Sequence, residues 1–135
     1  MRGIQLDNYF RNGSFAKLEV NSQISGYAIN DNNNLKICIV VDNTGLRKYS
    51  AEELSELELR FRQNMYSKGY DSIDILFLIY TDNVERDREA IKFVQVWLLD
   101  VKSKQAVIYD NQPQEFAGLG VWIETIAFRS ENKRK

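Results

Sequence analysis

The sequence predicts an α/β domain (α+β mixed): a single domain with a mixed sheet of about five strands and helices packed on it. Three observations lead to this fold class. The chain has 135 residues, 44% hydrophobic and 27% charged, which suits one globular domain that needs no disulfides. Continuous apolar runs, typical of strands covered on both faces, alternate with segments of helical periodicity. Their order, α-β-β-α-β-α-β-β-α, indicates helical crossovers inside the chain and hairpins near both ends.

The first third of the chain predicts a helix and a hairpin. Apolar side chains over residues 6–10 have helical spacing, and an Asn-Gly pair ends that helix. Residues 15–20 continue as a second turn or as a strand. A weak strand over 26–29 and a strong one over 35–41 are joined by the turn 31–34, because short amide and acid side chains tolerate left-handed backbone conformations.

The segment 49–69 predicts the longest helix. Ser50, with Glu53 three residues later, has the capping-box spacing, and the apolar side chains that follow fall on one face. Gly69 suits the left-handed conformation that ends many helices. Residues 73–80 then form the most apolar strand.

The last part of the chain predicts a short helix, a hairpin and a final helix. Asn83 can cap the short helix. Residues 94–101 and 106–109 are strands joined by a polar turn. Pro113, the single proline, suits the first turn of an amphipathic helix that ends at about Phe128.

The charge of the chain is uneven. Residues 129–135 have a net charge of +3, which leaves residues 1–128 with −4 of the total of −1. The acidic body argues against a nucleic-acid partner. We therefore divide the chain into a domain over 1–128 and a basic tail over 129–135. The cations of the tail are Arg129, Lys133, Arg134 and Lys135.

The residue inventory excludes several reaction classes. The absence of histidine removes Ser–His and Cys–His nucleophile pairs, histidine-ligated zinc and imidazole acid–base chemistry from this chain. Cys38 is the single cysteine, so no internal disulfide forms, and its apolar neighbours predict a core side chain. The longest apolar stretch, residues 75–80, is far shorter than the roughly 20 residues of a membrane span, and no signal-peptide pattern opens the chain. No cofactor, metal site or catalytic residue is predicted.

Four acids follow predicted strands, namely Asp42, Asp82, Asp100 and Asp110. Carboxylates at strand ends line many α/β active sites, but they are also what turns prefer, and we favour the turn interpretation. Asp100-Val101-Lys102 matches the short acid-x-lysine pattern of metal-dependent nucleases. That pattern is common by chance, and here it leads directly into a turn.

The two tryptophans have different expected environments. Trp97 alternates with apolar neighbours in a strand and is predicted to be core. Trp122 points about 100° away from Ile123 on the predicted helix, toward solvent or a partner. An exposed tryptophan beside Phe116 or Phe128 would form an interaction patch.

The order of these segments resembles the N-terminal soluble domain of rhomboid-family membrane proteins from clostridia-like bacteria. The resemblance spans nearly the whole chain, and it rests on the order and spacing of short motifs. These motifs are Leu6-Asp7-Asn8-Tyr9-Phe10, Ile39-Val40-Val41-Asp42, Gly69-Tyr70 before the strand 73–81, Trp97-Leu98-Leu99-Asp100, Ile108-Tyr109-Asp110-Asn111-Gln112-Pro113 and Phe116-Ala117-Gly118-Leu119.

The resemblance implies a non-catalytic accessory domain on the cytoplasmic side of the bacterial inner membrane, which regulates or recruits partners or substrates there. The tail would lead to a membrane segment absent from this chain and contact the anionic membrane surface weakly, since Lys and Arg favour the cytoplasmic side. The partner would be a protein or the transmembrane part of the parent chain. The candidate interaction residues are Asn111, Gln112, Phe116 and Trp122. The Gly-x-Ser-Gly motif and the histidine of rhomboid proteases are missing, so no catalytic residue carries over.

Two other functions remain open at this point. One is a free-standing cytosolic enzyme or nucleotide-binding protein that uses the strand-end aspartates. The other is the metal-dependent nuclease. The reading frame beyond Lys135 separates them from the first hypothesis, because a hydrophobic span there supports a membrane protein.

Overall fold

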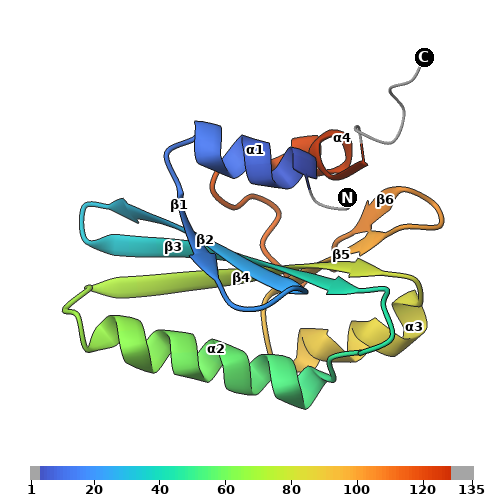
Figure 1. The fold of residues 1–135 in the computed structure, drawn as a ribbon, viewed down its shortest axis with the longest axis horizontal. Helices are drawn as coiled ribbons and strands as arrows, with labels where there is room; N and C mark the ends of the chain where they lie inside the picture. The colour runs from blue at the N-terminus through green and yellow to red at the C-terminus, as the bar shows by residue number, and fades with distance from the viewer. Residues whose placement is uncertain (1–3, 129–135) are drawn as a thin grey trace.

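The computed structural model describes residues 4–128, which form one six-stranded mixed sheet with helices on both faces (Figure 1). The strands lie side by side in their sequence order, from β1 to β6. The elements are α1 (Ile4–Asn12), β1 (Ala16–Glu19), β2 (Ile24–Asp31), β3 (Asn34–Asn43), α2 (Ala51–Tyr66), β4 (Ser72–Thr81), α3 (Val84–Asp87), the 3₁₀ helix η1 (Arg88–Lys92), β5 (Val96–Asp100), β6 (Gln105–Val107), the 3₁₀ helix η2 (Gly120–Trp122) and α4 (Ile123–Phe128).

The sheet combines parallel and antiparallel pairs as predicted. The strands β1, β2 and β3 form an antiparallel meander, β3, β4 and β5 are parallel, and β6 returns antiparallel to β5. The sixth strand arises because residues 16–19 form β1, which settles the choice between a helical turn and a strand. Leu18 of β1 lies directly opposite Gly26 of β2 and packs over it.

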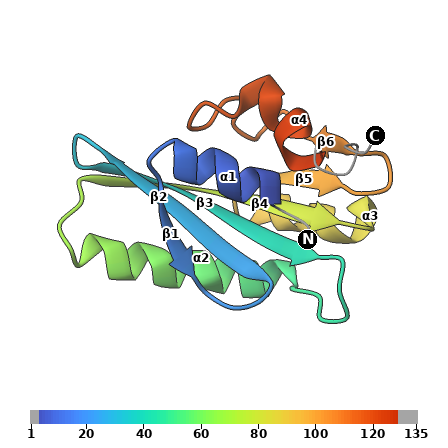
Figure 2. The same cartoon turned by 45° about the horizontal axis from the view of Figure 1, so that its top comes forward.

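Helices cover the two faces of the sheet in two separate layers. The helices α2 and α3–η1 lie on one face, and α1 and α4 lie together on the other (Figures 1 and 2). The strand β4 contributes to both cores, because alternate side chains of a strand point to opposite faces. Leu76, Leu78 and Tyr80 join the core under α1 and α4, while Ile75 and Phe77 join the core above α2. This double burial explains the unbroken apolar sequence of β4.

The helix α2 begins as the sequence predicts. The Oγ atom of Ser50 accepts a hydrogen bond from the backbone N–H of Glu53 at 3.1 Å, and the Glu53 carboxylate accepts one from the Ser50 N–H at 2.8 Å. Leu54 is buried against the sheet. Gly69, with φ of +92°, follows the last helical turn in the left-handed region. The capping box and the C-terminal glycine are therefore both confirmed.

The hairpin turns are also confirmed. Asn32 and Asn33 join β2 to β3 with φ values of +54° and +67°. Asparagine occupies this left-handed region more readily than most residues with a side chain. Lys104, with φ of +56°, lies in the turn between β5 and β6.

The predicted final helix from Pro113 is wrong over most of its length, because α4 begins only at Ile123. Tertiary contacts fix the preceding segment in turns: the Trp97 indole N–H donates to the Pro113 carbonyl oxygen at 2.6 Å. Ala117 and Gly118 then have φ values of +52° and +81°, which a right-handed helix does not admit. The apolar side chains of this segment reach the core from turns instead of from a helix face.

None of the helices within residues 4–128 combines the length and apolar character needed to cross a bilayer.

Candidate functional site

Three of the four predicted strand-end acids lie at the same edge of the sheet. Asp42 lies near the end of β3, Asp82 directly follows β4 and Asp100 ends β5. Because these strands are parallel, their carboxyl ends share an edge, where α/β proteins commonly bind ligands. Asp110 lies beyond β6, which runs in the opposite direction, so it leaves the sheet away from this edge. We call this region the carboxyl-end edge.

Two of these carboxylates shape turns. The Asp42 carboxylate accepts a hydrogen bond from the Thr44 N–H at 3.0 Å, and the Asp100 carboxylate accepts bonds from the Lys102 N–H and the Ser103 hydroxyl, both at 3.0 Å. These are the local side-chain bonds that stabilise turns, as the sequence indicates. The acid-x-lysine pattern thus lies within the turn that joins β5 and β6.

At the centre of the carboxyl-end edge lies a cluster of three buried polar side chains, which the sequence did not predict. Asn43 and Thr81, neighbours across β3 and β4, are fully buried, and Asp87 of α3 is 6% exposed. The Asp87 carboxylate accepts hydrogen bonds from the Asn43 amide at 3.1 Å and from the Thr81 hydroxyl at 2.6 Å. Asp87 therefore joins α3 to the ends of two strands.

Arg86 links this buried group to the surface. Its guanidinium makes a bidentate contact with Asp87, both distances being 2.9 Å, and reaches Asp82 at 3.0 Å. The hydrogen bond with Asp87 raises the pKa of Arg86, so its charge is permanent. Burial acts to raise the pKa of Asp82, but hydrogen bonds from Arg86 and Lys48 outweigh it and hold that pKa below its ordinary value. The network thus pairs two cations with two carboxylates: Arg86 contacts both Asp82 and Asp87, and Lys48 contacts Asp82.

The same network fixes the loop 43–50 between β3 and α2. The Asn43 side chain donates to the Tyr49 carbonyl oxygen at 3.2 Å and accepts from the Tyr49 N–H at 2.8 Å. Gln23, from the turn before β2, donates to the Arg47 carbonyl oxygen at 3.0 Å. Between these attachments the loop holds Leu46 with its side chain fully exposed.

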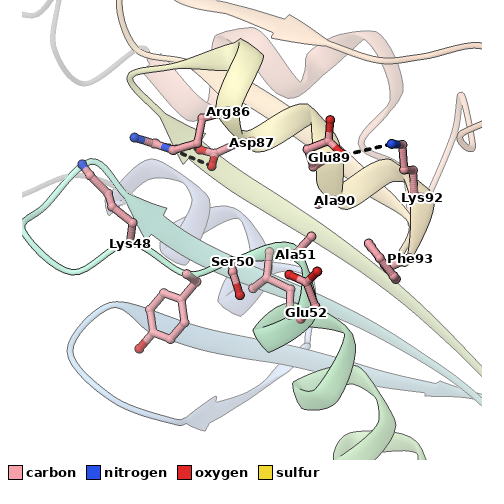
Figure 3. Close-up of a pocket in the computed structure, with 12 residues that line it drawn as sticks. Lys48, Ser50, Ala51, Glu52, Arg86, Asp87, Glu89, Ala90, Lys92 and Phe93 are labelled. Carbon is pink, nitrogen blue, oxygen red and sulfur yellow. Dashed lines mark hydrogen bonds and ion pairs between the residues drawn. The ribbon is translucent and has the colours of Figure 1, made fainter.

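A cavity of about 440 Å³ opens between the start of α2 and α3–η1. Figure 3 shows Arg86 and Asp87 on one side of it and Ser50 and Glu52 on the other. Its apolar lining includes Phe93, which is 48% exposed. The charges around it are largely paired, so the cavity offers an apolar or aromatic contact surface more than a binding site for a small anion.

A second cavity, of about 520 Å³, lies between the turn before β2 and the outer side of α2. Tyr49 lines both cavities, and the Arg47 guanidinium stacks over its ring at 4.4 Å. Asn21 donates to the Tyr49 hydroxyl at 3.0 Å, which connects the two walls. Val20, 39% exposed, adds an apolar side chain to the rim.

The predicted interaction residues have different environments. Trp122 is 64% exposed and Asn111 is exposed, in keeping with a surface role. Gln112 and Phe116 lie inside the fold instead: the Gln112 side chain accepts a hydrogen bond from the Val96 N–H at 2.8 Å, and Phe116 packs in the core under α4. The tail cations, namely Arg129, Lys133, Arg134 and Lys135, lie outside the described residues.

Cys38 is completely buried in β3, as the sequence predicts. Burial raises the pKa of its thiol, because an apolar environment disfavours the thiolate. Its side chain acts as a small apolar group in the core.

Within residues 4–128 no three His, Cys, Asp or Glu side chains gather closely enough to hold a metal ion. Comparison of the chain with family models, curated proteins and solved structures yields no match.

Proposed function

We propose that this chain is a non-catalytic domain of a rhomboid-like membrane protein, which recruits a protein partner through the loop 43–50. The observation that supports this proposal is that the polar side chains at the carboxyl-end edge hold the loop 43–50 in place. In this chain these groups hydrogen-bond one another and hold a loop that presents Leu46 to solvent.

The hydrogen bonds that the strand-end aspartates already accept favour this proposal over a catalytic function. A catalytic or nucleotide-binding role for Asp42, Asp82 or Asp100 requires free carboxylate oxygens aimed at a ligand. Each of these groups instead accepts hydrogen bonds from its own turn or network. Releasing them would unpair Arg86 and open the loops at this edge.

Leu46 has the properties of a contact residue. Burying a leucine side chain on a partner contributes about 1.5–3 kcal/mol, which corresponds to roughly a 10- to 150-fold gain in affinity. The fixed ends of the loop mean that little backbone freedom is lost on binding. No contact within the fold requires a leucine at this position, since its side chain is fully exposed.

The cytoplasmic membrane location is supported by the sequence resemblance and by the basic residues 129–135, which follow α4. The helix α4 lies on the face of the sheet opposite α2 (Figure 1). A domain continuing from α4 into a membrane segment would keep α2 and its two cavities accessible.

Site-specific photo-crosslinking tests the proposed contact. A benzophenone side chain is placed at Leu46 in the full-length protein and, as a matched control, at Leu59, which is 53% exposed on α2. We expect a discrete protein adduct from position 46, which an excess of the unsubstituted protein abolishes by competition and an excess of the Leu46→Asp variant does not. Equal adducts from both positions, or none from position 46, would contradict the proposal.

An activity assay tests the alternatives. The domain is incubated with casein and with plasmid DNA in the presence of Mg²⁺ or Mn²⁺, and we expect no cleavage of either. DNA cleavage that disappears in Asp100→Ala would favour the nuclease, since Asp100 belongs to the acid-x-lysine pattern.

A further inference from the structure

We propose that the open edge of β1 pairs with β1 of a second copy of this chain, antiparallel about a two-fold axis at Leu18, to give a dimer with a continuous sheet. This inference rests on the sheet edge alone and does not depend on the proposed recruitment function.

The two edge strands, β6 and β1, differ in whether another part of the fold contacts their outer backbone groups. At the β6 edge the Ala106 N–H donates to the Glu124 carboxylate of α4 at 2.8 Å, so a side chain of the fold occupies this edge. At the other edge, β1 has β2 as its single neighbour among residues 4–128, and it lies in front of the sheet in Figure 1. Ala16, Lys17 and Glu19 are exposed there. An unpaired strand of this kind is a template for another strand.

The backbone of β1 selects which residues would pair. In an antiparallel ladder, alternate residues direct their N–H and C=O groups toward the neighbouring strand. The Val20 N–H donates to the Ile24 carbonyl oxygen at 3.3 Å, and the register then places Leu18 in the set that faces β2. Lys17 and Glu19 therefore direct their backbone groups outward, where a second strand can bond them.

The side chains make this edge complementary to itself. Lys17 and Glu19 lie on the same face of β1, two residues apart. A two-fold axis at Leu18 places the Lys17 of each copy opposite the Glu19 of the other. The dimer therefore has two such Lys–Glu pairs. Shifting the axis to position 17 or 19 would oppose like charges, which is destabilising. The charge pattern therefore favours one register.

Glu19 is the side chain that is free to move toward a second copy. It is 74% exposed, so its carboxylate can reach the Lys17 of a second copy, whose side chain is 29% exposed and whose Nζ keeps its 2.9 Å contact with Asp7. Leu18 would meet its counterpart on the opposite face, next to Val20, which is 39% exposed. A four-residue edge buries little surface, so the dimer should be weak.

Sedimentation velocity over a concentration series tests this proposal. The unsubstituted chain of residues 1–135 should dimerise reversibly as its concentration rises. Glu19→Lys and Lys17→Glu should each remain monomeric, because like charges then face each other twice. Glu56→Lys, which makes the same charge change on α2, should dimerise like the parent.

An equimolar mixture of Glu19→Lys and Lys17→Glu gives the most discriminating test of the proposed pairing. Their charges are complementary across the axis, so the mixture should form a heterodimer that neither variant forms alone. Lys17→Glu also removes an ion pair with Asp7 at 2.9 Å, so thermal unfolding must show that both variants are folded. If Lys17→Glu does not fold, Glu19→Lys against the Glu56→Lys control decides. A parent that stays monomeric, single variants that dimerise, or a mixture of folded variants that stays monomeric would overturn the proposal.

Discussion

Asp87 is the residue on which the carboxyl-end edge depends most. Replacing it with alanine leaves Asn43 and Thr81 buried without their acceptor and Arg86 without its main partner. Breaking a buried charge pair in this way costs about 3 kcal/mol. We expect urea denaturation of Asp87→Ala to show a loss of that size in the free energy of unfolding.

A matched control lies on the same short helix. Glu85, whose side chain is 83% exposed, contacts Arg88 at 3.4 Å. Glu85→Gln should change the free energy of unfolding by less than about 0.5 kcal/mol. Equal effects of the two substitutions would mean that the buried network contributes nothing beyond ordinary surface charge.

Asp7 makes the stability depend on pH. Burial acts to raise its pKa, but hydrogen bonds from Lys17 and from the Tyr27 hydroxyl, at 2.7 Å, outweigh burial and hold the pKa below its ordinary value. A lowered pKa in the folded state contributes stability above the unfolded value of about 3.9, and this is lost as the pH falls through the folded pKa. Asp7→Asn should therefore show a smaller fall in melting temperature between neutral and strongly acidic pH than the parent. An identical fall would contradict this role.

The turn roles of Asp42 and Asp100 could be predicted from sequence, because their partners lie within three residues along the chain. The role of Asp87 could not, because Asn43 and Thr81 are brought to it only by the pairing of β3 with β4. A signal was nevertheless present: Asn43 and Thr81 are polar residues at the ends of apolar strands, where a buried partner is needed.

The N-terminus of α2 gives a prediction at the scale of one element. Ser50→Ala removes the side-chain acceptor of the Glu53 N–H and should lower the free energy of unfolding by about 0.5–2 kcal/mol. Ser50→Gly should cost only a few tenths of a kcal/mol, because glycine is tolerated at this position. Chemical denaturation of both variants checks this, and an unchanged midpoint for Ser50→Ala would show that the cap contributes no stability.

Local sequence determined some elements and not others. The helix α2 carries its own start and stop signals, so its position could be predicted. The segment from Pro113 to Leu119 also has apolar residues at helical spacing, but its hydrogen bond to Trp97 and its positive φ angles fix it in turns. Tertiary contacts here override the periodicity, and one sequence does not reveal such contacts.

At the scale of the whole molecule, the fold class follows from the order of the segments. Helices between parallel strands and hairpins at both ends determine a mixed sheet, which the structure confirms. The position of the last helix beside α1 did not follow, because packing between the two ends of a chain leaves no periodic signal in either.

The proposed location gives a prediction for residues 1–135, the domain together with its basic tail. Each Lys or Arg near an anionic leaflet contributes on the order of 1 kcal/mol. The four tail cations, offset by Glu131, should bind phosphatidylserine vesicles weakly at low salt. Salt should abolish this binding, because the Debye length is about 8 Å at physiological ionic strength. Sedimentation with vesicles measures it.

Deletion of residues 129–135 should remove that vesicle binding. Binding that survives the deletion would place the membrane contact elsewhere, with the exposed Trp122 as the next position to vary. Vesicles of neutral lipid serve as the control for charge.

The two-layer arrangement also determines when each core can close as the chain is synthesised. The buried residues of the core above α2 run from Ile24 to Leu98, so this core can largely form before residues 116–128 have been made. The opposite core needs Phe116, Leu119 and Ile123, so Trp97 and Tyr80 have no cover from α4 until residues 116–128 have been made. The nascent chain thus exposes one apolar face of a formed sheet for the interval between the synthesis of β5 and that of α4, and chaperones that bind apolar surface have that interval in which to act.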